Sequence, residues 1–280
     1  FEGDTALESI TVSADNTGLS SVDGILFNKD KTAILLYPKS RSGKYTIPDT
    51  VTTIGELSFS DCKNLTEIVI GKGITEISKN AFSGCTALTK VVIGDNVTTI
   101  GSSAFVNCTA LEKVVISDSV TTIADSAFSQ CKKITQVTFG KNITTIGRYA
   151  FYNNNALTEV DLSKCTGLTT IGSDAFEYNY ALTTLTLPDS LQTIGYQAFY
   201  NCSKLTELEI GSNLTLIDGY AFQNCDSLKT VNIKGGNNAT IDYSAFYSCN
   251  NLESVTIGNG VKTIGSYAFE YCDKLKEVKI

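Results

Sequence analysis

Nine cysteines are the residues of this 280-residue chain whose type and spacing first suggest chemistry. Recurring cysteines can form disulfides, hold zinc as thiolates or supply a reactive nucleophile. One of them, Cys165, stands apart in the insertion LSKCTGL. The regularly spaced ones are Cys62, Cys85, Cys108, Cys131, Cys202, Cys225, Cys249 and Cys272. Their chemistry depends on how the surrounding elements place them.

The spacing of the cysteines argues against zinc and against disulfides. Zinc needs thiolates that converge, typically from CxxC pairs, and cysteines spread one per repeat do not converge. Disulfides between neighbouring repeats are sterically conceivable, but the total is odd, and Asn154 and Asn179 replace cysteine in two adjacent repeats. We therefore interpret the column as small, buried, free thiols, whose place an asparagine can take if its amide bonds to neighbouring backbone. Cys165 is expected to be a turn residue.

Composition excludes several classes of function. The chain has no histidine, so Ser-His-Asp or Cys-His catalysis and His-ligated metals are excluded within it. The net charge is −7 and no Lys/Arg run stands out, so neither nucleic acid nor an anionic membrane is an expected partner. No apolar run is long enough to span a membrane, and no signal peptide opens the chain. We expect no enzymatic activity, no cofactor and no metal.

A missing methionine bears on the extent of the chain. The sequence has no methionine, not even an initiator. We therefore expect it to be a piece of a longer protein, with Phe1 at a cut end. Any export signal or wall anchor would then lie outside this sequence.

The repeat is marked by a phenylalanine every 23 residues, with steps of 25 before Phe176 and 24 before Phe246. Cysteine or asparagine follows three residues later, and then a strand phrase of alternating apolar residues, as in LTKVVI at 88–93. Ten such units, or eleven if residues 1–12 are included, predict a stacked solenoid, because a lone unit cannot bury its apolar face. The phenylalanines, expected in the core, are Phe59, Phe82, Phe105, Phe128, Phe151, Phe176, Phe199, Phe222, Phe246 and Phe269.

The phrases of the repeat resemble the BspA-like, or treponemal-type, leucine-rich repeats of bacterial surface proteins. TIPDTVTTIGELSFSDC at 46–62 and TLPDSLQTIGYQAFYNC at 186–202 carry the family's pattern including its proline, whereas other units have Gly, Ser or Lys there. The resemblance covers residues 44–280 and, in part, 1–12. We expect a leucine-rich-repeat solenoid, a right-handed curved array of about 23-residue repeats. A parallel β-sheet should line its concave face, with short turns, 3₁₀ or helical segments on the convex face.

The N-terminal segment departs from the repeat period. Residues 22–38 contain two apolar runs around a polar turn at 28–31, which predicts a β-hairpin. We expect residues 1–43 to be an N-terminal partial repeat with this hairpin inserted, continuous with the array of about ten repeats at 44–280, in a single structural domain. The hairpin is expected to cover or extend the first turns, and a dedicated binding role is the alternative.

A threonine precedes the closing isoleucine of most repeats. A column of threonines on a second, narrow sheet agrees with the preference of threonine for pleated surfaces. Regular ranks of threonine can also bind ice or sugars, and we prefer the structural interpretation.

The outward positions of the strands are the candidate ligand contacts. An apolar strip flanked by charge is expected at Val69, Val92, Val115, Lys90 and Lys113. An acidic patch is expected at Glu159, Asp161, Glu207 and Glu209. Paired carboxylates can hydrolyse glycosides when one of them has a raised pKa. Nothing on an open sheet removes water from one of these four, so we interpret them as a solvated face.

Tyrosines are concentrated in the second half of the chain, where many flank the Ala-Phe pair. They are expected at the edge or the convex side, partly exposed. They either cover the core or offer a recognition surface, because tyrosine combines contact area with a polar tip. The candidates for recognition are Tyr149, Tyr152, Tyr196, Tyr200, Tyr243 and Tyr247.

The resemblance implies a non-enzymatic interaction and adhesion module, secreted or on the surface of a bacterium. Its partners would be proteins or glycans of host matrix or mucosa, or of other bacterial cells. Two alternatives remain. The first is a structural spacer in a larger surface protein, and the second is a carbohydrate-binding surface that uses the tyrosine rows.

Overall fold

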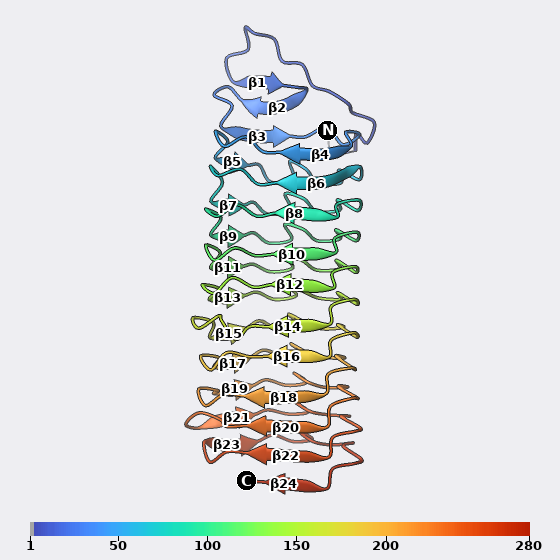
Figure 1. Cartoon of the computed structure of the whole chain (residues 1–280), viewed down its shortest axis with the longest axis vertical. Helices are drawn as coiled ribbons and strands as arrows, with labels where there is room; N and C mark the ends of the chain where they lie inside the picture. Colours follow the sequence, from blue (N-terminus) through green and yellow to red (C-terminus); the bar gives the residue numbers. More distant parts are fainter. Residues whose placement is uncertain (1–2) are drawn as a thin grey trace.

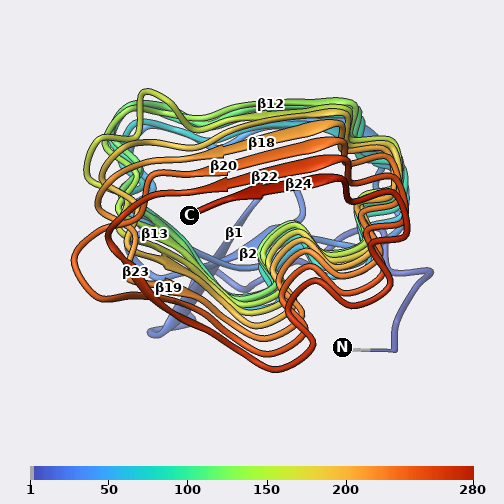
Figure 2. The ribbon, with the colours of Figure 1, turned by 90° about the horizontal axis from the view of Figure 1, so that it is seen from below.

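A computed structural model describes residues 3–280, so the repeat anchor expected at Phe1 lies outside the described range. The chain forms a right-handed β-solenoid of about eleven turns (Figure 1). Each regular turn contributes one strand to a sheet of longer strands, the wide sheet, and one to a sheet of shorter strands, the narrow sheet (Figure 2). Figure 1 shows the turns in an almost straight column, in which the expected concave and convex faces are not distinct. The faces are therefore named by their sheets.

The wide sheet is built from the strand phrase of each repeat. Its strands are parallel and form a seven-stranded part, β4 to β16, and a four-stranded part, β18 to β24. Side chains alternate between the two faces, so Val91 is buried while Lys90 and Val92 face solvent. The strands are β4 Gly43–Thr46, β6 Leu65–Val69, β8 Lys90–Val92, β10 Lys113–Val115, β12 Gln136–Thr138, β14 Glu159–Asp161, β16 Thr184–Thr186, β18 Glu207–Ile210, β20 Thr230–Ile233, β22 Ser254–Ile257 and β24 Glu277–Lys279.

The narrow sheet contains the threonine column. Thr122 pairs with Thr99 on one side and with Thr145 on the other, while the isoleucine that follows each of them points into the core. Nine of its strands, β7 to β23, form one uninterrupted parallel sheet. The strands are β5 Thr53–Ile54, β7 Glu76–Ile77, β9 Thr99–Ile100, β11 Thr122–Ile123, β13 Thr145–Ile146, β15 Thr170–Ile171, β17 Thr193–Ile194, β19 Leu216–Ile217, β21 Ala239–Ile241 and β23 Val261–Ile264.

The N-terminal segment adds three strands to the first regular turn. Strands β1 (Leu19–Val22) and β2 (Ile25–Asn28) form an antiparallel hairpin, and β2 pairs antiparallel with β3 (Ala33–Leu36). Strand β3 pairs parallel with β5, so these strands continue the narrow-sheet side beyond the first turn (Figure 1). Within the segment, the backbone N–H of Ser40, after β3, donates to the carbonyl of Leu7, before β1, at 3.2 Å. The pairing of β3 with β5 attaches the segment to the array.

A stack of phenylalanine rings fills the centre of the solenoid. From Phe82 to Phe269, successive ring centroids lie 5.2–5.4 Å apart, and the ring planes differ by only 1–10°. The rings from Phe59 to Phe246 are fully buried. Offset stacking adds about 0.5–1.5 kcal/mol per pair beyond the burial of apolar area. One ring therefore supports the next along the whole array.

The cysteine column forms hydrogen bonds between successive turns. The thiol of Cys85 donates to the carbonyl oxygen of Phe59, in the preceding turn, at 3.1 Å. In one of the repeats without cysteine, Nδ2 of Asn154 makes the same bond to the carbonyl of Phe128 at 3.0 Å. All nine cysteines are free and buried, and the Cys165 thiol donates to a carbonyl of the preceding turn at 3.4 Å. Cysteine and asparagine are thus equivalent as donors at this position.

The prediction of 3₁₀ or helical segments opposite the wide sheet is not supported, because residues 3–280 contain only turns there. The residues two before and two after each phenylalanine from Phe59 to Phe269 have φ between 51° and 72°. Left-handed residues four apart cannot belong to a right-handed helix. Successive β-turns form the segment instead, and we call it the turn face.

The left-handed residues support a third ladder of hydrogen bonds. In one turn, the N–H groups of Ser103, Phe105 and Asn107 donate to carbonyls of the following turn at 2.8–2.9 Å. The N–H group of each anchor phenylalanine from Phe59 to Phe246 likewise donates to a carbonyl of the next turn. The solenoid is therefore held by the wide sheet, the narrow sheet and this turn ladder.

The turn geometry predicts opposite effects of glycine at two adjacent serines. Ser102 and Ser103 are the central residues of a β-turn closed by the Ala104 N–H and the Gly101 carbonyl, and Ser103 has φ 55°. Ser103→Gly should raise the free energy of unfolding by about 0.5–1 kcal/mol, because it relieves the left-handed strain. Ser102→Gly, the matched control, should lower it by about 0.5–1 kcal/mol. Urea denaturation measures both, and the same sign for both variants would contradict the assigned turn.

The burial of the cysteines predicts their reactivity. Burial raises the pKa of eight of the nine thiols, to about 12 for Cys62 and Cys131, and leaves little thiolate on them near neutral pH. The pKa of Cys272, in the last turn, is instead lowered by a hydrogen bond with Cys249. At pH 8 we expect slow modification of the native protein by a thiol reagent. In denaturant without reductant, all nine thiols should react. A count of one would mean that the others are paired in disulfides.

Candidate interaction surface

Clusters of metal-ligating side chains and membrane-spanning helices are both absent from the described part of the chain. Among residues 3–280, no group of three or more His, Cys, Asp or Glu side chains is placed to hold a metal ion. In the same range there is no helix long and apolar enough to cross a membrane. The candidate ligand contacts lie on the outward faces of the sheets and on the turn face.

The first candidate is an apolar strip on β6, β8 and β10. Val115 is 60% exposed and Val92 is 38% exposed, whereas Val69, which pairs with Val92, is half-buried. Lys90 and Lys113 lie side by side at the beginning of β8 and β10. Together these side chains form an apolar surface with a positively charged border.

A carboxylate beside this strip is neutralised by lysines. The Nζ atoms of Lys44 and Lys90 lie 3.3 and 3.2 Å from Oε1 of Glu67. These hydrogen bonds lower the pKa of Glu67 below its usual value. The wide sheet around β4 to β10 therefore has no excess of negative charge.

The acidic patch lies further along the same sheet. Glu159 and Asp161 lie on β14 and pair with Thr184 and Thr186 of β16, and Glu207 and Glu209 follow on β18. All four carboxylates are exposed, and none has a lysine or arginine within ion-pair distance in residues 3–280. A hydrogen bond from Ser163 lowers the pKa of Asp161, so this group does not have the raised pKa that a glycosidase acid requires.

The wide sheet has three weak junctions, and each one opens a groove. Strands β6 and β8 pair over three residues, but β8 and β10 pair over one, and the alternation repeats with β10–β12 and β12–β14. No ladder joins β16 to β18. The grooves at β8/β10, β12/β14 and β16/β18 measure about 740, 160 and 390 Å³. The core side chains of Ile93, Phe139 and Leu185 line them, and each is 7% exposed.

The tyrosines form rows along the turn face. Edge-to-face contacts join Tyr149 to Tyr152 at 5.5 Å and Tyr220 to Tyr243 at 5.0 Å between ring centroids. Tyr196 contacts Tyr220 in the same way, while Tyr200 contacts a ring not predicted from the sequence, that of Tyr178. Tyr243 is 39% exposed, whereas Tyr149, Tyr152, Tyr196, Tyr200 and Tyr247 are half-buried. The rings cover one another as well as the core.

Two buried carboxyl groups under the tyrosines were also missed from the sequence. Asp174 is 4% exposed and Glu177 is 7% exposed. Burial, followed by repulsion from Asp174, raises the pKa of Glu177 to about 7, and burial also raises the pKa of Asp174. The segment SDAFEY at 173–178 carries the available signal, because no other Phe-anchored repeat from Phe59 to Phe269 has an acid at both of these positions.

The raised pKa of Glu177 predicts that stability depends on pH. Because the folded state binds this proton more tightly than the unfolded state, whose pKa is near 4.5, the free energy of unfolding should fall as pH rises from about 4.5 to about 7. Glu177→Gln keeps the shape of the neutral acid. It should therefore raise the melting temperature at pH 8 and have little effect at pH 5, whereas Glu209→Gln on the exposed sheet should change neither much. An effect of Glu177→Gln that is equal at both pH values would contradict the burial of an ionisable pair.

Solved structures similar to this one include leucine-rich repeat proteins of several bacteria. A leucine-rich repeat protein from Bacteroides ovatus is 26% identical, covers 93% of this chain and 72% of its own, and superposes with a TM-score of 0.66. A leucine-rich repeat protein from Eubacterium ventriosum is 20% identical over 91% of this chain and 93% of its own, with a TM-score of 0.53, and shows the shared fold. A leucine rich cell surface protein from Faecalibacterium prausnitzii is 24% identical over 95% and 96%, with a TM-score of 0.43.

Family assignment rests on the sequence match. No curated protein matches the chain. The family model described as the BspA type leucine rich repeat region matches residues 37–158 and 169–280 in six copies. These two ranges include most of the chain and all the strands from β4 to β24 except β14 (Glu159–Asp161). The chain therefore belongs to the BspA-type leucine-rich repeat family.

Proposed function

We propose that this chain is a non-enzymatic protein-interaction and adhesion module, secreted or displayed on a bacterial surface, whose binding face is the outward side of the wide sheet. The observation that carries the proposal is the contrast between the inward and the outward positions of the wide-sheet strands. Inward positions repeat almost unchanged, whereas the outward positions held by Lys90 and Val92 on β8 are held by Glu207 and Glu209 on β18. Stacking needs only the inward residues, so the outward ones are free to be selected for a partner.

The tyrosine rows support a carbohydrate surface less well. Sugars stack on aromatic ring faces, but the edge-to-face contacts between tyrosines already occupy part of these faces. On the wide sheet, by contrast, Val92 and Val115 are exposed, and the four carboxylates form no ion pair within residues 3–280. We take the wide sheet as the counterpart of the concave binding sheet expected for such arrays.

We also propose that residues 1–43 and the array at 44–280 form one structural domain. Strand β3 pairs with β5, and β4, at the boundary, pairs with β6 over four residue pairs. The ring of Tyr37 stacks on Phe59 at 4.8 Å, which continues the phenylalanine stack into the N-terminal segment. These contacts support a role of the hairpin in extending the first turns.

A binding screen with two matched double variants tests the proposed face. The intact array is offered to purified matrix proteins and to glycans at micromolar concentration. Val92→Arg with Val115→Arg should reduce binding to a protein ligand at least about tenfold, because two charges replace the apolar centre of the contact. Thr145→Arg with Thr170→Arg, on the exposed narrow sheet, should preserve it. Circular dichroism of both variants verifies folding.

Other outcomes of the screen support the alternatives. Equal loss of binding in both double variants would place the contact elsewhere than on the wide sheet. Glycan binding that is abolished by Tyr243→Ser would support the tyrosine surface. The absence of any binding by the folded array would support a structural spacer.

A further inference from the structure

We propose that the acidic half of the wide sheet, centred on the groove between β16 and β18, binds an extended lysine- or arginine-rich segment of a partner protein. This inference rests on the proposed function and specifies the chemistry of the partner. Three features support it, which are the shape of the groove, the unbalanced charge around it and the spacing of that charge.

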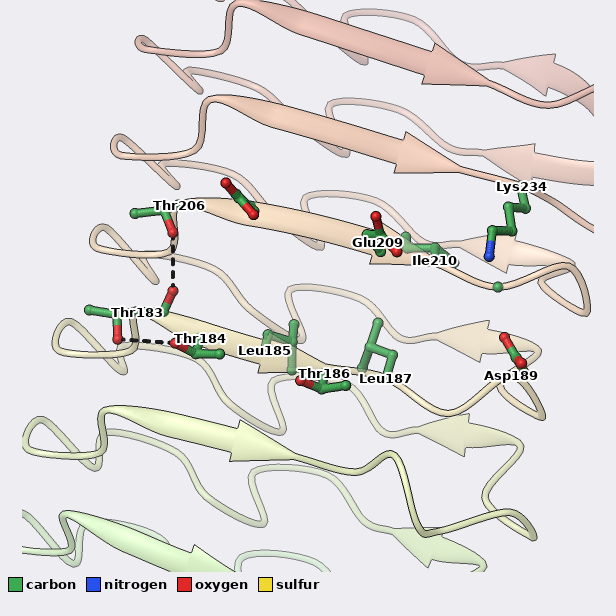
Figure 3. A pocket seen from close by; sticks show the side chains of 12 residues that line it. Thr183, Thr184, Leu185, Thr186, Leu187, Asp189, Thr206, Glu209, Ile210 and Lys234 are labelled. Carbon is green, nitrogen blue, oxygen red and sulfur yellow. Dashed lines mark hydrogen bonds between the residues drawn. The ribbon is translucent and has the colours of Figure 1, made fainter.

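The groove lies where the wide sheet is interrupted. No ladder joins β16 to β18, while β17 and β19 of the narrow sheet remain paired behind them. Figure 3 shows Leu185 and Leu187 at the groove, with the hydroxyl groups of Thr184 and Thr186 beside them. The volume of about 390 Å³ is open to solvent along the strands. An elongated occupant with apolar portions fits this shape.

The charge around the groove is negative and unpaired. Glu207 and Glu209 line it. Figure 3 shows Asp189 at one end of the groove. None of these carboxylates has a lysine or arginine within ion-pair distance in residues 3–280. Elsewhere on the wide sheet Glu67, Glu253 and Glu277 each pair with a lysine. An acidic partner would be repelled here, whereas a cationic one would supply the missing counter-charges.

The carboxylates form two rows whose spacing matches an extended peptide. Within each row the two acids are two residues apart, Glu159 and Asp161 on β14 and Glu207 and Glu209 on β18, which is roughly 6.5–7 Å along the strand. The two rows lie on either side of β16, because β14 and β18 are its neighbours in the stack (Figure 1). A peptide lying along β16 directs alternate side chains to opposite sides at the same interval of two residues. Lysines on either side then reach one carboxylate row each.

The floor of the groove suits the stems of these side chains. The aliphatic part of a lysine or arginine can cover Leu185 and Leu187 while its charged end remains in water. Lys234 lines one end of the groove (Figure 3). This lysine limits the cationic part of the peptide to the remainder of the groove, so the position of the peptide along β16 is defined by charge as well as by shape.

Peptide titration tests the proposal directly. The probe is a blocked heptapeptide with four consecutive lysines, Lys-Lys-Lys-Lys-Thr-Thr-Thr, which in an extended form directs two lysines to each side. The control peptide, Lys-Thr-Lys-Thr-Lys-Thr-Lys, has the same composition but directs all four lysines to one side. Isothermal titration calorimetry gives the affinity, and NMR of the methyl groups of Thr184 and Thr186 identifies the place of binding. The peptide with consecutive lysines should bind more tightly, shift these two methyl signals and weaken as salt is added.

Two double variants of equal charge change separate the groove from general attraction. Glu207→Gln with Glu209→Gln should weaken binding of the peptide with consecutive lysines at least about fourfold, since each exposed ion pair contributes roughly a two- to fivefold factor. Glu253→Gln with Glu277→Gln changes the same net charge elsewhere on the wide sheet and should have less than a twofold effect. Equal effects of the two variants, equal affinity of the two peptides, or no binding of either peptide would overturn the proposal.

The proposed function and this inference can fail separately. A protein ligand that is lost with the Val92→Arg and Val115→Arg variant but kept with Glu207→Gln and Glu209→Gln would preserve the wide sheet as the binding face and overturn the acidic groove. Binding of the peptide in the absence of any protein ligand would establish the groove and leave the adhesion role contradicted by the screen.

Discussion

Each turn of this solenoid must present to its successor the same surface that it receives from its predecessor. The spacing between turns is fixed by backbone hydrogen bonds on the two sheets and the turn face, so a side chain in the core always meets its own counterpart. This explains why Phe82, Phe105 and Phe128 stack almost parallel, and why the thiol of Cys108 donates to the carbonyl of Phe82 as Cys85 does to Phe59. A residue that breaks the match affects both of its neighbours. Asparagine is accepted in the cysteine column because Asn154 and Asn179 repeat the same donor function and add an acceptor for the backbone.

The constraint separates the chain into positions that build the scaffold and positions that are free. Inward residues on both sheets are apolar in nearly every turn, whereas the outward side of the wide sheet passes from lysine and valine to unpaired carboxylates. A partner that lies across several turns would meet a different chemical surface at each end. The array can therefore distinguish partners by their charge pattern without any change to its core.

The family and the stacked architecture were predicted from the sequence, because a period of 23 residues and the alternation along each strand appear directly in the order of residues. The left-handed turns were not predicted. Glycines at these positions would have indicated a positive φ, but residues such as Leu57, Tyr149 and Gln197 occupy them. The three grooves depend on pairing between turns, which no single repeat encodes. Phe139, larger than the isoleucine or leucine at this position in the other turns, lines one of them, while the other two grooves have Ile93 and Leu187 there. The burial of Glu177 likewise comes from rings of neighbouring turns.

The alternation of strong and weak junctions has a mechanical consequence. From β7 to β23 the narrow sheet and the turn ladder pass each junction without interruption. The wide sheet, by contrast, is joined by three residue pairs, then one, and finally none between β16 and β18. Under tension along the axis, load is carried on two sides of the cross-section, and the third side is the compliant one. Bending is therefore easiest in the direction that opens the wide sheet. A partner seated in a groove would stiffen the column at that point.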